Sequence, residues 1–289
     1  MVKITLDGID LEIQANGEKP SHFTGVLWGP AKAGKTTMYA TLPKPILWIM
    51  NDLEGEVSVP KGDDHLILPL YKAKTSVVDQ LIVSNSIFYS RLKEQVVEAG
   101  VKSLVFDSLT AFASLAFNRA IEITKANSRE PSKVTVFMPG LQGWGARSMA
   151  TKQLMVSLTY FAASCNLHLG MTAHEAAEKT KTVEVAGQST SIPYLQTMSL
   201  GGDLPNDLSR QISEVWYIKD ENGQRKVYLR PFGVKQPMGT RMFDTRTKSS
   251  FVWAYDSFTR KGEGGLSTWI KAWEDNKYQP LSLDITSQT

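Results

Sequence analysis

The segment from residue 23 to residue 40 constrains the fold of this chain more than any other part of the sequence. An apolar run at residues 23–28 predicts a buried strand, and the next eight residues read Gly-Pro-Ala-Lys-Ala-Gly-Lys-Thr. They fit the spacing G-x-x-x-x-G-K-[ST], in which glycines let backbone N–H groups surround phosphate oxygens. A helix is predicted from residue 36, and its N-terminus would face the same phosphates. This arrangement is typical of an α/β fold that binds a nucleoside triphosphate.

The residues of this loop are predicted to bind the nucleotide. The predicted nucleotide-binding residues are Gly29, Pro30, Ala31, Lys32, Ala33, Gly34, Lys35 and Thr36. We expect Lys35 to contact the β- and γ-phosphates. The hydroxyl of Thr36 would bind Mg²⁺, which prefers oxygen ligands. A chance glycine-rich turn is the alternative, and the position between a strand and a helix disfavours it.

Short apolar strands alternate with helices beyond the loop. Strands are predicted at residues 45–50, 65–70, 103–106 and 167–172, and helices at 76–99, 110–126 and 143–164. This alternation is typical of a mostly parallel central sheet with helices on both faces. Toward the C-terminus, strands at 215–219 and 226–229 flank Asn222-Gly223, a strong signal for an antiparallel hairpin. Another hairpin is predicted ahead of the core, around Asp7-Gly8.

Four side chains that follow predicted strands are candidates for chemistry. Asp107 has the placement of a carboxylate that holds magnesium, although an aspartate after a strand can also cap a helix. Glu54 is the candidate base that activates water, with Asp52 as the alternative, and either could be a solvated loop acid. His174 could sense the γ-phosphate by hydrogen bonding or be a satisfied surface histidine. Glu54 and His174, together with Lys35 of the loop, are the predicted catalytic residues.

The composition narrows the class of protein. The chain has 289 residues, 42% hydrophobic and 21% charged, and its net charge of +3 is too small to indicate a polyanionic partner. Cys165 is the only cysteine, so no intramolecular disulfide is possible and a cytoplasmic protein is expected. The scattered histidines have no zinc-ligand spacing. No apolar run approaches the roughly 20 residues that span a bilayer, so no membrane partner is expected.

Basic residues gather between residues 217 and 250. The cluster consists of Lys219, Arg225, Lys226, Arg230, Lys235, Arg241, Arg246 and Lys248, against Asp220, Glu221 and Asp244. It could bind nucleic-acid phosphates, reach a neighbouring subunit's nucleotide as an arginine finger, or be a solvated basic hairpin. Lys235 and Arg241 are the best finger candidates because they follow the hairpin. Of the seven tryptophans, which could stack on single strands, Trp144 between two glycines is the best candidate for an exposed one.

Residues 175–204 differ from the segments on either side. They are rich in Thr, Ser, Gly, Lys and Gln and have little apolar periodicity. Long connections without structure of their own are uncommon in compact domains and are often functional. The segment is therefore predicted to be a functional loop.

Three motifs together resemble the RecA-like ATPases. They are Gly-Pro-x-x-x-Gly-Lys-Thr-Thr at 29–37, Asp-x-Glu at 52–54 and Leu-Val-Phe-Asp-Ser at 104–108. Within that superfamily the chain looks most like the compact, phage-encoded nucleotide-binding proteins that include single-strand-annealing recombinases. The cues are residues 42–45, 172–175 and 193–207, and the resemblance covers about residues 20–235.

The resemblance implies a RecA-like P-loop NTPase with an N-terminal hairpin at residues 1–20, an ATPase core at 21–235 and a C-terminal extension at 236–289. It implies ATP and Mg²⁺ as ligands, with Thr37 among the nucleotide contacts, and a homo-oligomeric ring or filament. The loop at 175–204 would face DNA. The implied function is annealing or strand exchange on single-stranded DNA during phage recombination or replication, in the cytoplasm of a bacterial host.

Two departures from the family pattern affect the mechanism. His174 stands where recombinases usually carry Gln, although some ring helicases have His there. Lys32 is unusual inside the loop, and it is either a second phosphate contact or an exposed charge. Two other functions stay open: a P-loop kinase acting on a small molecule, and a nucleotide switch that loads partners without strand exchange.

Overall fold

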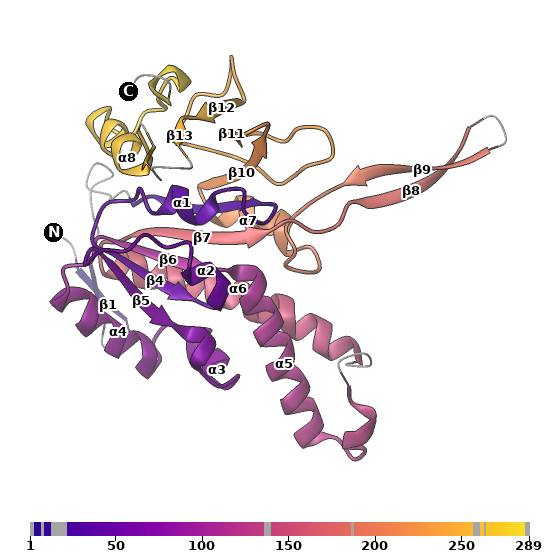
Figure 1. Cartoon of the computed structure of the whole chain (residues 1–289). Helices are drawn as coiled ribbons and strands as arrows, with labels where there is room; N and C mark the ends of the chain where they lie inside the picture. The colour runs from indigo at the N-terminus through magenta and orange to yellow at the C-terminus, as the bar shows by residue number, and fades with distance from the viewer. Residues whose placement is uncertain are drawn as a thin grey trace.

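One eight-stranded sheet runs through the computed structural model, in the order β12-β11-β10-β3-β7-β6-β4-β5 (Figure 1). Its strands are β3 (Thr24–Gly29), β4 (Ile46–Met50), β5 (His65–Pro69), β6 (Ser103–Asp107), β7 (His168–His174), β10 (Glu214–Glu221), β11 (Gln224–Tyr228) and β12 (Ser250–Trp253). Pairs from β10 to β5 are parallel, whereas β11 and β12 join antiparallel. The predicted α/β fold class is confirmed. The structure describes residues 3–6, 9–12, 22–135, 140–185, 188–256, 261–262 and 264–286.

Helices cover both faces of the sheet. They are α1 (Lys35–Tyr39), α2 (Leu53–Glu56), α3 (Val77–Leu81), α4 (Ile87–Glu98), α5 (Leu109–Asn127), α6 (Gly140–Ser164), α7 (Leu204–Gln211) and α8 (Leu266–Asp275). Leu92, Phe112 and Leu158 represent α4, α5 and α6 in one buried apolar cluster. Met38 of α1 and Trp269 of α8 belong to a second cluster. Figure 1 shows α1 and α8 above β7 and α3, α5 and α6 below it. None of the helices in the described ranges is long and apolar enough to cross a membrane.

Two neighbouring inner strands, β4 and β6, show why the sheet forms where the apolar runs predict it. Every residue of both strands is buried. Parallel strands covered by helices on both faces are expected to read as continuous apolar runs rather than as alternating patterns. The runs at 45–50 and 103–106 meet this expectation. The polar residues that follow them therefore mark the side of the sheet where the parallel strands have their carboxyl ends.

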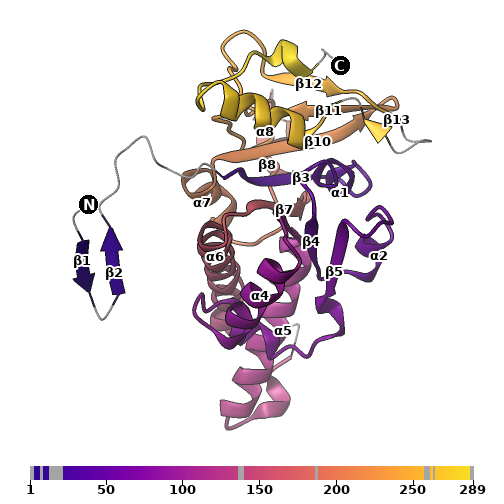
Figure 2. The same cartoon turned by 90° about the vertical axis from the view of Figure 1, so that its left-hand side faces the viewer.

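The C-terminal part of the chain completes the layer over α1 (Figure 2). β12 pairs with β11, and α8 places Trp269 and Trp273 in the second buried cluster. The start of α8 contacts the end of α1, since the backbone N–H of Leu266 donates to Thr41 Oγ1 at 2.9 Å. The boundary predicted after residue 235 thus falls between two strands of the same sheet.

The tryptophans are mostly core residues. Those with described side chains are all buried in the two apolar clusters: Trp28, Trp48, Trp216, Trp253, Trp269 and Trp273. The side chain of Trp144 lies outside the described part of the chain. The buried tryptophans therefore contribute to packing and offer no surface on which a base could stack.

Much of the segment 175–204, which was expected to be a loop, instead forms a two-stranded ribbon. β8 (Lys179–Val185) pairs antiparallel with β9 (Gln188–Leu195) in a sheet separate from the central one. We call these two strands the arm, and Figure 1 shows it extending away from the core. The loop expectation was wrong because most described arm side chains are exposed, so neither strand has the apolar alternation of a half-buried strand.

Smaller hairpins lie at both ends of the chain. β1 (Lys3–Leu6) and β2 (Ile9–Glu12) pair antiparallel as the alternating pattern predicts, and the Asp7-Gly8 turn lies outside the described residues. β13 (Tyr255–Asp256) pairs with β14 (Lys261–Gly262). Each pair forms a two-stranded sheet separate from the central sheet.

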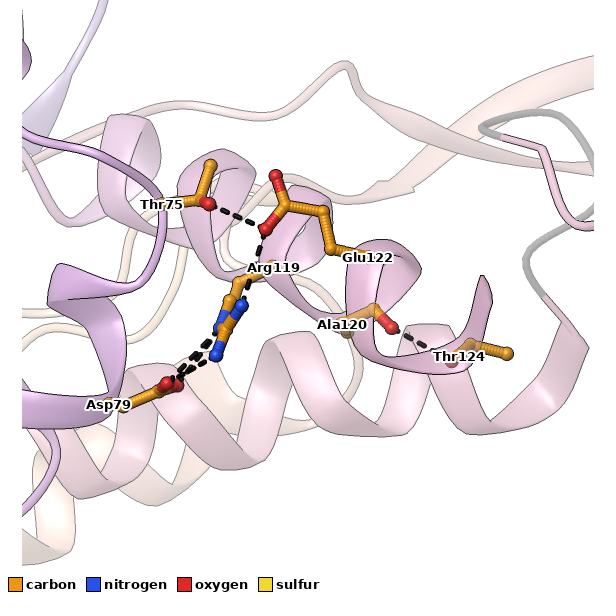
Figure 3. A network of polar contacts seen from close by, with 6 residues as sticks. All are labelled: Thr75, Asp79, Arg119, Ala120, Glu122 and Thr124. Carbon is orange, nitrogen blue, oxygen red and sulfur yellow. Dashed lines mark hydrogen bonds and ion pairs between the residues drawn. The ribbon is translucent and has the colours of Figure 1, made fainter. Parts of the chain in front are cut away.

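Charged side chains fasten α3 to α5, the helix that begins just after Asp107. Arg119 donates from Nη2 to Asp79 Oδ2 at 2.6 Å and from Nη1 to Glu122 Oε2 at 3.4 Å (Figure 3). The same Glu122 oxygen accepts a hydrogen bond from Thr75 at 2.6 Å. These side chains are partly exposed, so the network orients the two helices but adds little to the free energy of unfolding.

Glu214, at the start of β10, ties the chain after β11 back to the sheet. Its side chain is 1% exposed. Oε1 accepts hydrogen bonds from the backbone N–H groups of Arg241 and Met242, at 2.8 and 3.0 Å. Oε2 accepts from Trp216 Nε1 at 3.0 Å and from Thr240 Oγ1 at 2.5 Å. Burial nevertheless raises the pKa of Glu214 to about 7, because desolvation outweighs these donors.

We expect the contribution of Glu214 to the free energy of unfolding to fall between pH 4.5 and pH 7. The pKa of Glu214 is about 7 in the folded chain, against 4.5 as the ordinary value. The folded state therefore binds more protons in this window, and the stability from Glu214 is full below pH 4.5 and is lost as the pH rises through 7. Urea unfolding of Glu214→Gln, which cannot titrate, should lack this component. The same pH dependence in both proteins would contradict the assignment.

Candidate nucleotide site

The predicted phosphate loop lies where β3 ends, at the carboxyl edge of the parallel strands. Its backbone requires glycine at two positions. Gly29 has φ +149°, and a side chain there would collide with the carbonyl oxygen of Ile218 in β10. Gly34 has φ +98° and precedes α1, which has no side-chain N-cap. The first N–H groups of α1 can therefore donate to a phosphate instead of to a capping side chain.

Lys35 is held inside the loop. Its side chain is 6% exposed, and Nζ donates to the carbonyl oxygens of Gly29 at 3.1 Å and Pro30 at 2.6 Å. Burial lowers the pKa of Lys35 to about 8, against the opposing influence of the Asp107 and Glu175 charges. Because its two hydrogen-bond partners are neutral carbonyls, the ammonium charge is left to attract the phosphates of a nucleotide.

Asp107 is held by hydroxyl groups from two other elements. Thr36 Oγ1 donates to Asp107 Oδ2 at 2.7 Å, and Thr172 Oγ1 donates to Asp107 Oδ1 at 2.5 Å. Ser108, whose side chain accepts from the backbone N–H of Ala111, provides the N-cap of α5. Asp107 is therefore not used as that cap. Sequence reasoning missed Thr172, because only the pairing of β6 with β7 reveals that it faces Asp107.

Thr36 and Asp107 fit the predicted magnesium site. They offer one hydroxyl and one carboxylate, the oxygen ligands that Mg²⁺ prefers, and their contact brings both groups to one point. Magnesium bound with a nucleotide usually takes one or two protein ligands and completes its shell with phosphates and water. In the described ranges, no group of three or more His, Cys, Asp or Glu could hold another metal ion.

A cavity of about 190 Å³ connects the loop with the other candidates. It is lined by Ala31, Lys32, Gly34, Lys35, Thr36, Asp52, Glu54, Gly55, Ser58, Asp107 and His174. The three predicted catalytic residues thus share one cavity with the two predicted magnesium ligands. These residues converge because the sheet is parallel here, so the carboxyl ends of β3, β4, β6 and β7 all lie on the same side of it.

The two acids after β4 differ in what their side chains do. Asp52 is the N-cap of α2, and its Oδ1 accepts from the backbone N–H of Glu54 at 3.1 Å. Glu54 is the second residue of the same short helix and is exposed at the cavity. One oxygen of Asp52 is therefore engaged by the backbone as the cap, whereas Glu54 has no capping role. This difference favours Glu54 over Asp52 as the group that contacts water.

His174 ends β7 at the rim of the cavity. Its backbone N–H donates to Thr110 Oγ1 at 2.9 Å. Burial lowers the pKa of His174, and the nearby Lys35 charge lowers it further. The ring is therefore neutral at physiological pH and can both donate and accept a hydrogen bond, as a γ-phosphate sensor requires.

Neither of the predicted finger residues lines this cavity. Lys235 Nζ bonds Gln196 Oε1 and lies 3.4 Å from Glu175 Oε2, so it is engaged within its own chain. The backbone of Arg241 is tied to Glu214 at the start of β10, opposite the edge that carries the loop, and its side chain is exposed. Arg241 therefore lies away from the nucleotide site of its own chain. Lys32 is exposed at the cavity mouth, and both interpretations of it stay open.

We expect nucleotide affinity to decline as the pH rises above about 8, because the phosphates bind the charged form of Lys35, whose pKa is about 8. Titration with ADP from pH 7 to pH 9.5 measures this effect. Lys35→Arg keeps its charge over the whole range, so its affinity should not vary with pH even if it is weaker throughout. Equal pH dependence of the two proteins would assign the proton to another group.

Comparison with known protein families agrees with this geometry. Residues 21–252 match the family described as AAA domain, a span that contains the loop, both acids, Asp107 and His174. No curated protein matches the chain. The expectation of a P-loop ATP-binding protein is confirmed at the level of the family. The chain belongs to the AAA-domain family of nucleotide-binding P-loop ATPases.

Proposed function

We propose that this protein is a RecA-like ATPase that acts on single-stranded DNA, annealing or exchanging strands during phage recombination or replication. The observation that carries the proposal is the arm, because Glu175, just before it, is bonded to Gly29 of the loop, and Lys235 links Glu175 to Gln196, just after it. A nucleotide site with a polar ribbon fastened to it has the parts needed to link hydrolysis to movement on a polymer.

The first step is hydrolysis of ATP to ADP and phosphate. The loop N–H groups and Lys35 would bind the phosphates. Magnesium held by Thr36 and Asp107 would neutralise charge on the phosphate oxygens. Glu54 would accept a proton from the attacking water, as its exposure at the cavity allows.

The start of the arm is joined to the loop through Glu175, the residue after His174. The backbone N–H of Glu175 donates to the carbonyl oxygen of Gly29 at 3.2 Å. Its Oε2 accepts from Tyr217 at 3.0 Å and lies 3.4 Å from Lys235 Nζ. A displacement of His174 by the γ-phosphate would therefore act on the start of β8.

The end of the arm is joined to the same contacts. Lys235 also bonds Gln196, the residue after β9. The backbone N–H of Gln196 donates to Val234 O at 2.7 Å, and the backbone N–H of Gln236 donates to Gln196 O at 3.0 Å. Lys235 thus links both ends of the arm, so a change at the nucleotide would move the two strands together.

The arm has the chemistry of a single-strand contact. Lys179 and Lys181 are exposed on β8, and Tyr194 of β9 is 49% exposed at an irregularity of the pairing. Lysines bind the phosphate backbone, and an exposed tyrosine ring can stack on a base. The arm strands carry one acid, Glu184, against these two lysines.

We also propose a homo-oligomer, either a ring or a filament. The nucleotide cavity opens at exposed Glu54. The exposed Arg241 lies at the opposite edge of the sheet and can serve only another subunit's nucleotide. Head-to-tail assembly would bring these two edges together, and such contacts generate rings or filaments.

Removal of the arm lysines tests the DNA role. We expect Lys179→Gln with Lys181→Gln to weaken single-stranded DNA binding, with a slope of log affinity against log salt that is shallower by about 0.7 for each lysine lost. The control replaces the exposed Lys93 and Lys102, away from the arm, by Gln. Fluorescence anisotropy across salt concentrations, with DNA-stimulated ATPase rates, gives the comparison. If wild-type protein binds no single strands and is not stimulated by them, the DNA role is wrong.

Replacement of the candidate base tests the hydrolysis step. We expect Glu54→Gln to lower the hydrolysis rate by about 100-fold while leaving ATP affinity unchanged, since general bases contribute roughly 10²–10⁴-fold. Asp52→Asn keeps an oxygen that can cap α2, so it should leave the hydrolysis rate nearly unchanged. A larger loss in Asp52→Asn than in Glu54→Gln would transfer the role to Asp52. Normal annealing by a Glu54→Gln protein that cannot hydrolyse ATP would favour a nucleotide switch.

A further inference from the structure

A second basic side chain, Arg225 of β11, lies at the phosphate loop of its own chain. The sheet register places it there. Tyr217 of β10 pairs with Trp28 of β3, so β10 runs past the end of β3 as far as Glu221. Asp220 then pairs with Arg225. Arg225 therefore lies beyond the last residues of β3, at the edge where the loop begins.

The alternation of β11 turns Arg225 toward α1. Val227, two residues further and on the same face, belongs to the buried cluster that contains Met38 of α1. Tyr228 belongs to the cluster on the opposite face of the sheet. Lys226, which shares the face of Tyr228, is directed away from α1.

The guanidinium group of Arg225 rests against the loop itself. A Cβ atom built on Gly34 would lie 2.7 Å from Nη1 and 2.8 Å from both Cζ and Nε. The guanidinium carbon also lies 6.0 Å from the centre of the Trp253 ring in β12, within range of a cation–π contact. Gly34 thus leaves the space that the guanidinium group occupies, and Trp253 supports the group from the next strand.

We propose that Arg225 is a second cation of the nucleotide site, donating to phosphate oxygens of the nucleotide bound by the same chain. An arginine stays charged at every physiological pH, and its planar group of donors matches phosphate geometry. Lys35 supplies a point charge inside the loop, whereas Arg225 supplies directed donors from the β11 side. This role differs from that of a finger, which reaches the nucleotide of a neighbouring subunit.

This inference rests on nucleotide binding by the loop and does not depend on DNA. The test compares Arg225→Gln and Arg225→Lys with Lys226→Gln, a control on the same strand with the opposite orientation. Calorimetric titrations with ATP, ADP and adenosine, without DNA, measure the dissociation constants. We expect Arg225→Gln to weaken ATP and ADP binding at least tenfold, with no change for adenosine. Arg225→Lys should recover part of the loss, and Lys226→Gln should bind as the wild type does.

Two further measurements separate a phosphate contact from a structural role. Thermal unfolding of the nucleotide-free Arg225→Gln protein should match the wild type, and the loss of affinity should shrink at high salt. A lowered melting temperature with unchanged ATP and ADP affinities would overturn the proposal, because Arg225 would then have only a structural role. An equal loss for adenosine would overturn it as well.

The lysine of the loop distinguishes this failure from a failure of the nucleotide site. Lys35→Ala should abolish ATP binding whatever Arg225 does. If Lys35→Ala loses ATP while Arg225→Gln binds it normally, only the Arg225 proposal is wrong. If wild type and Lys35→Ala bind ATP equally, the loop is not the nucleotide site and both ideas are wrong.

Discussion

The hydrogen bonds to Asp107 hold the functional part of this molecule together. One carboxylate, at the end of β6, accepts from Thr36 at the start of α1 and from Thr172 in β7. The group is 7% exposed, so loss of either hydroxyl would leave a buried carboxylate oxygen without that donor. Because the loop, β6 and β7 meet through this residue, the distance between the phosphate loop and the base of the arm is set by a few short bonds.

The second apolar cluster has a comparable influence on the other side of α1. β12 and α8 bring aromatic side chains from the last part of the chain over the loop helix, and Trp253 supports the side chain that touches Gly34. The residues after 235 are therefore part of the environment of the nucleotide loop. Because β11, β12 and α8 belong to the same chain as the loop, Lys35 and Arg225 are positioned before any other molecule binds. This positioning lowers the entropy cost of ordering their side chains when a nucleotide binds.

The arm illustrates how a polar segment can be ordered without a core. Its strands satisfy each other's backbone groups through the antiparallel ladder, and Glu175, Gln196 and Lys235 fix its two ends. An isolated two-stranded hairpin is marginally stable in water, so these anchoring contacts matter more here than they would inside a sheet. The arrangement leaves the middle of the arm exposed while its ends stay bonded to the site.

The sequence by itself determined the phosphate loop, the alternation of strands and helices, and the residues that end the strands, because these depend on local spacing and on apolar runs. It placed Lys35 and Thr36 in the loop after one strand and Asp107, Glu54 and His174 after three others, and a parallel sheet brings such strand ends to the same side. Only the tertiary structure decided that Thr172 holds Asp107, that Asp52 caps α2 and that residues 179–195 pair as a ribbon. It also decided that Arg225 lies on Gly34. The contacts of Thr172 with Asp107 and of Arg225 with Gly34 join residues far apart in the chain and depend on strand order and register, which no local pattern encodes. The cap of α2 and the pairing of the arm strands are local, but their mostly exposed side chains have no apolar periodicity that predicts a helix or a strand.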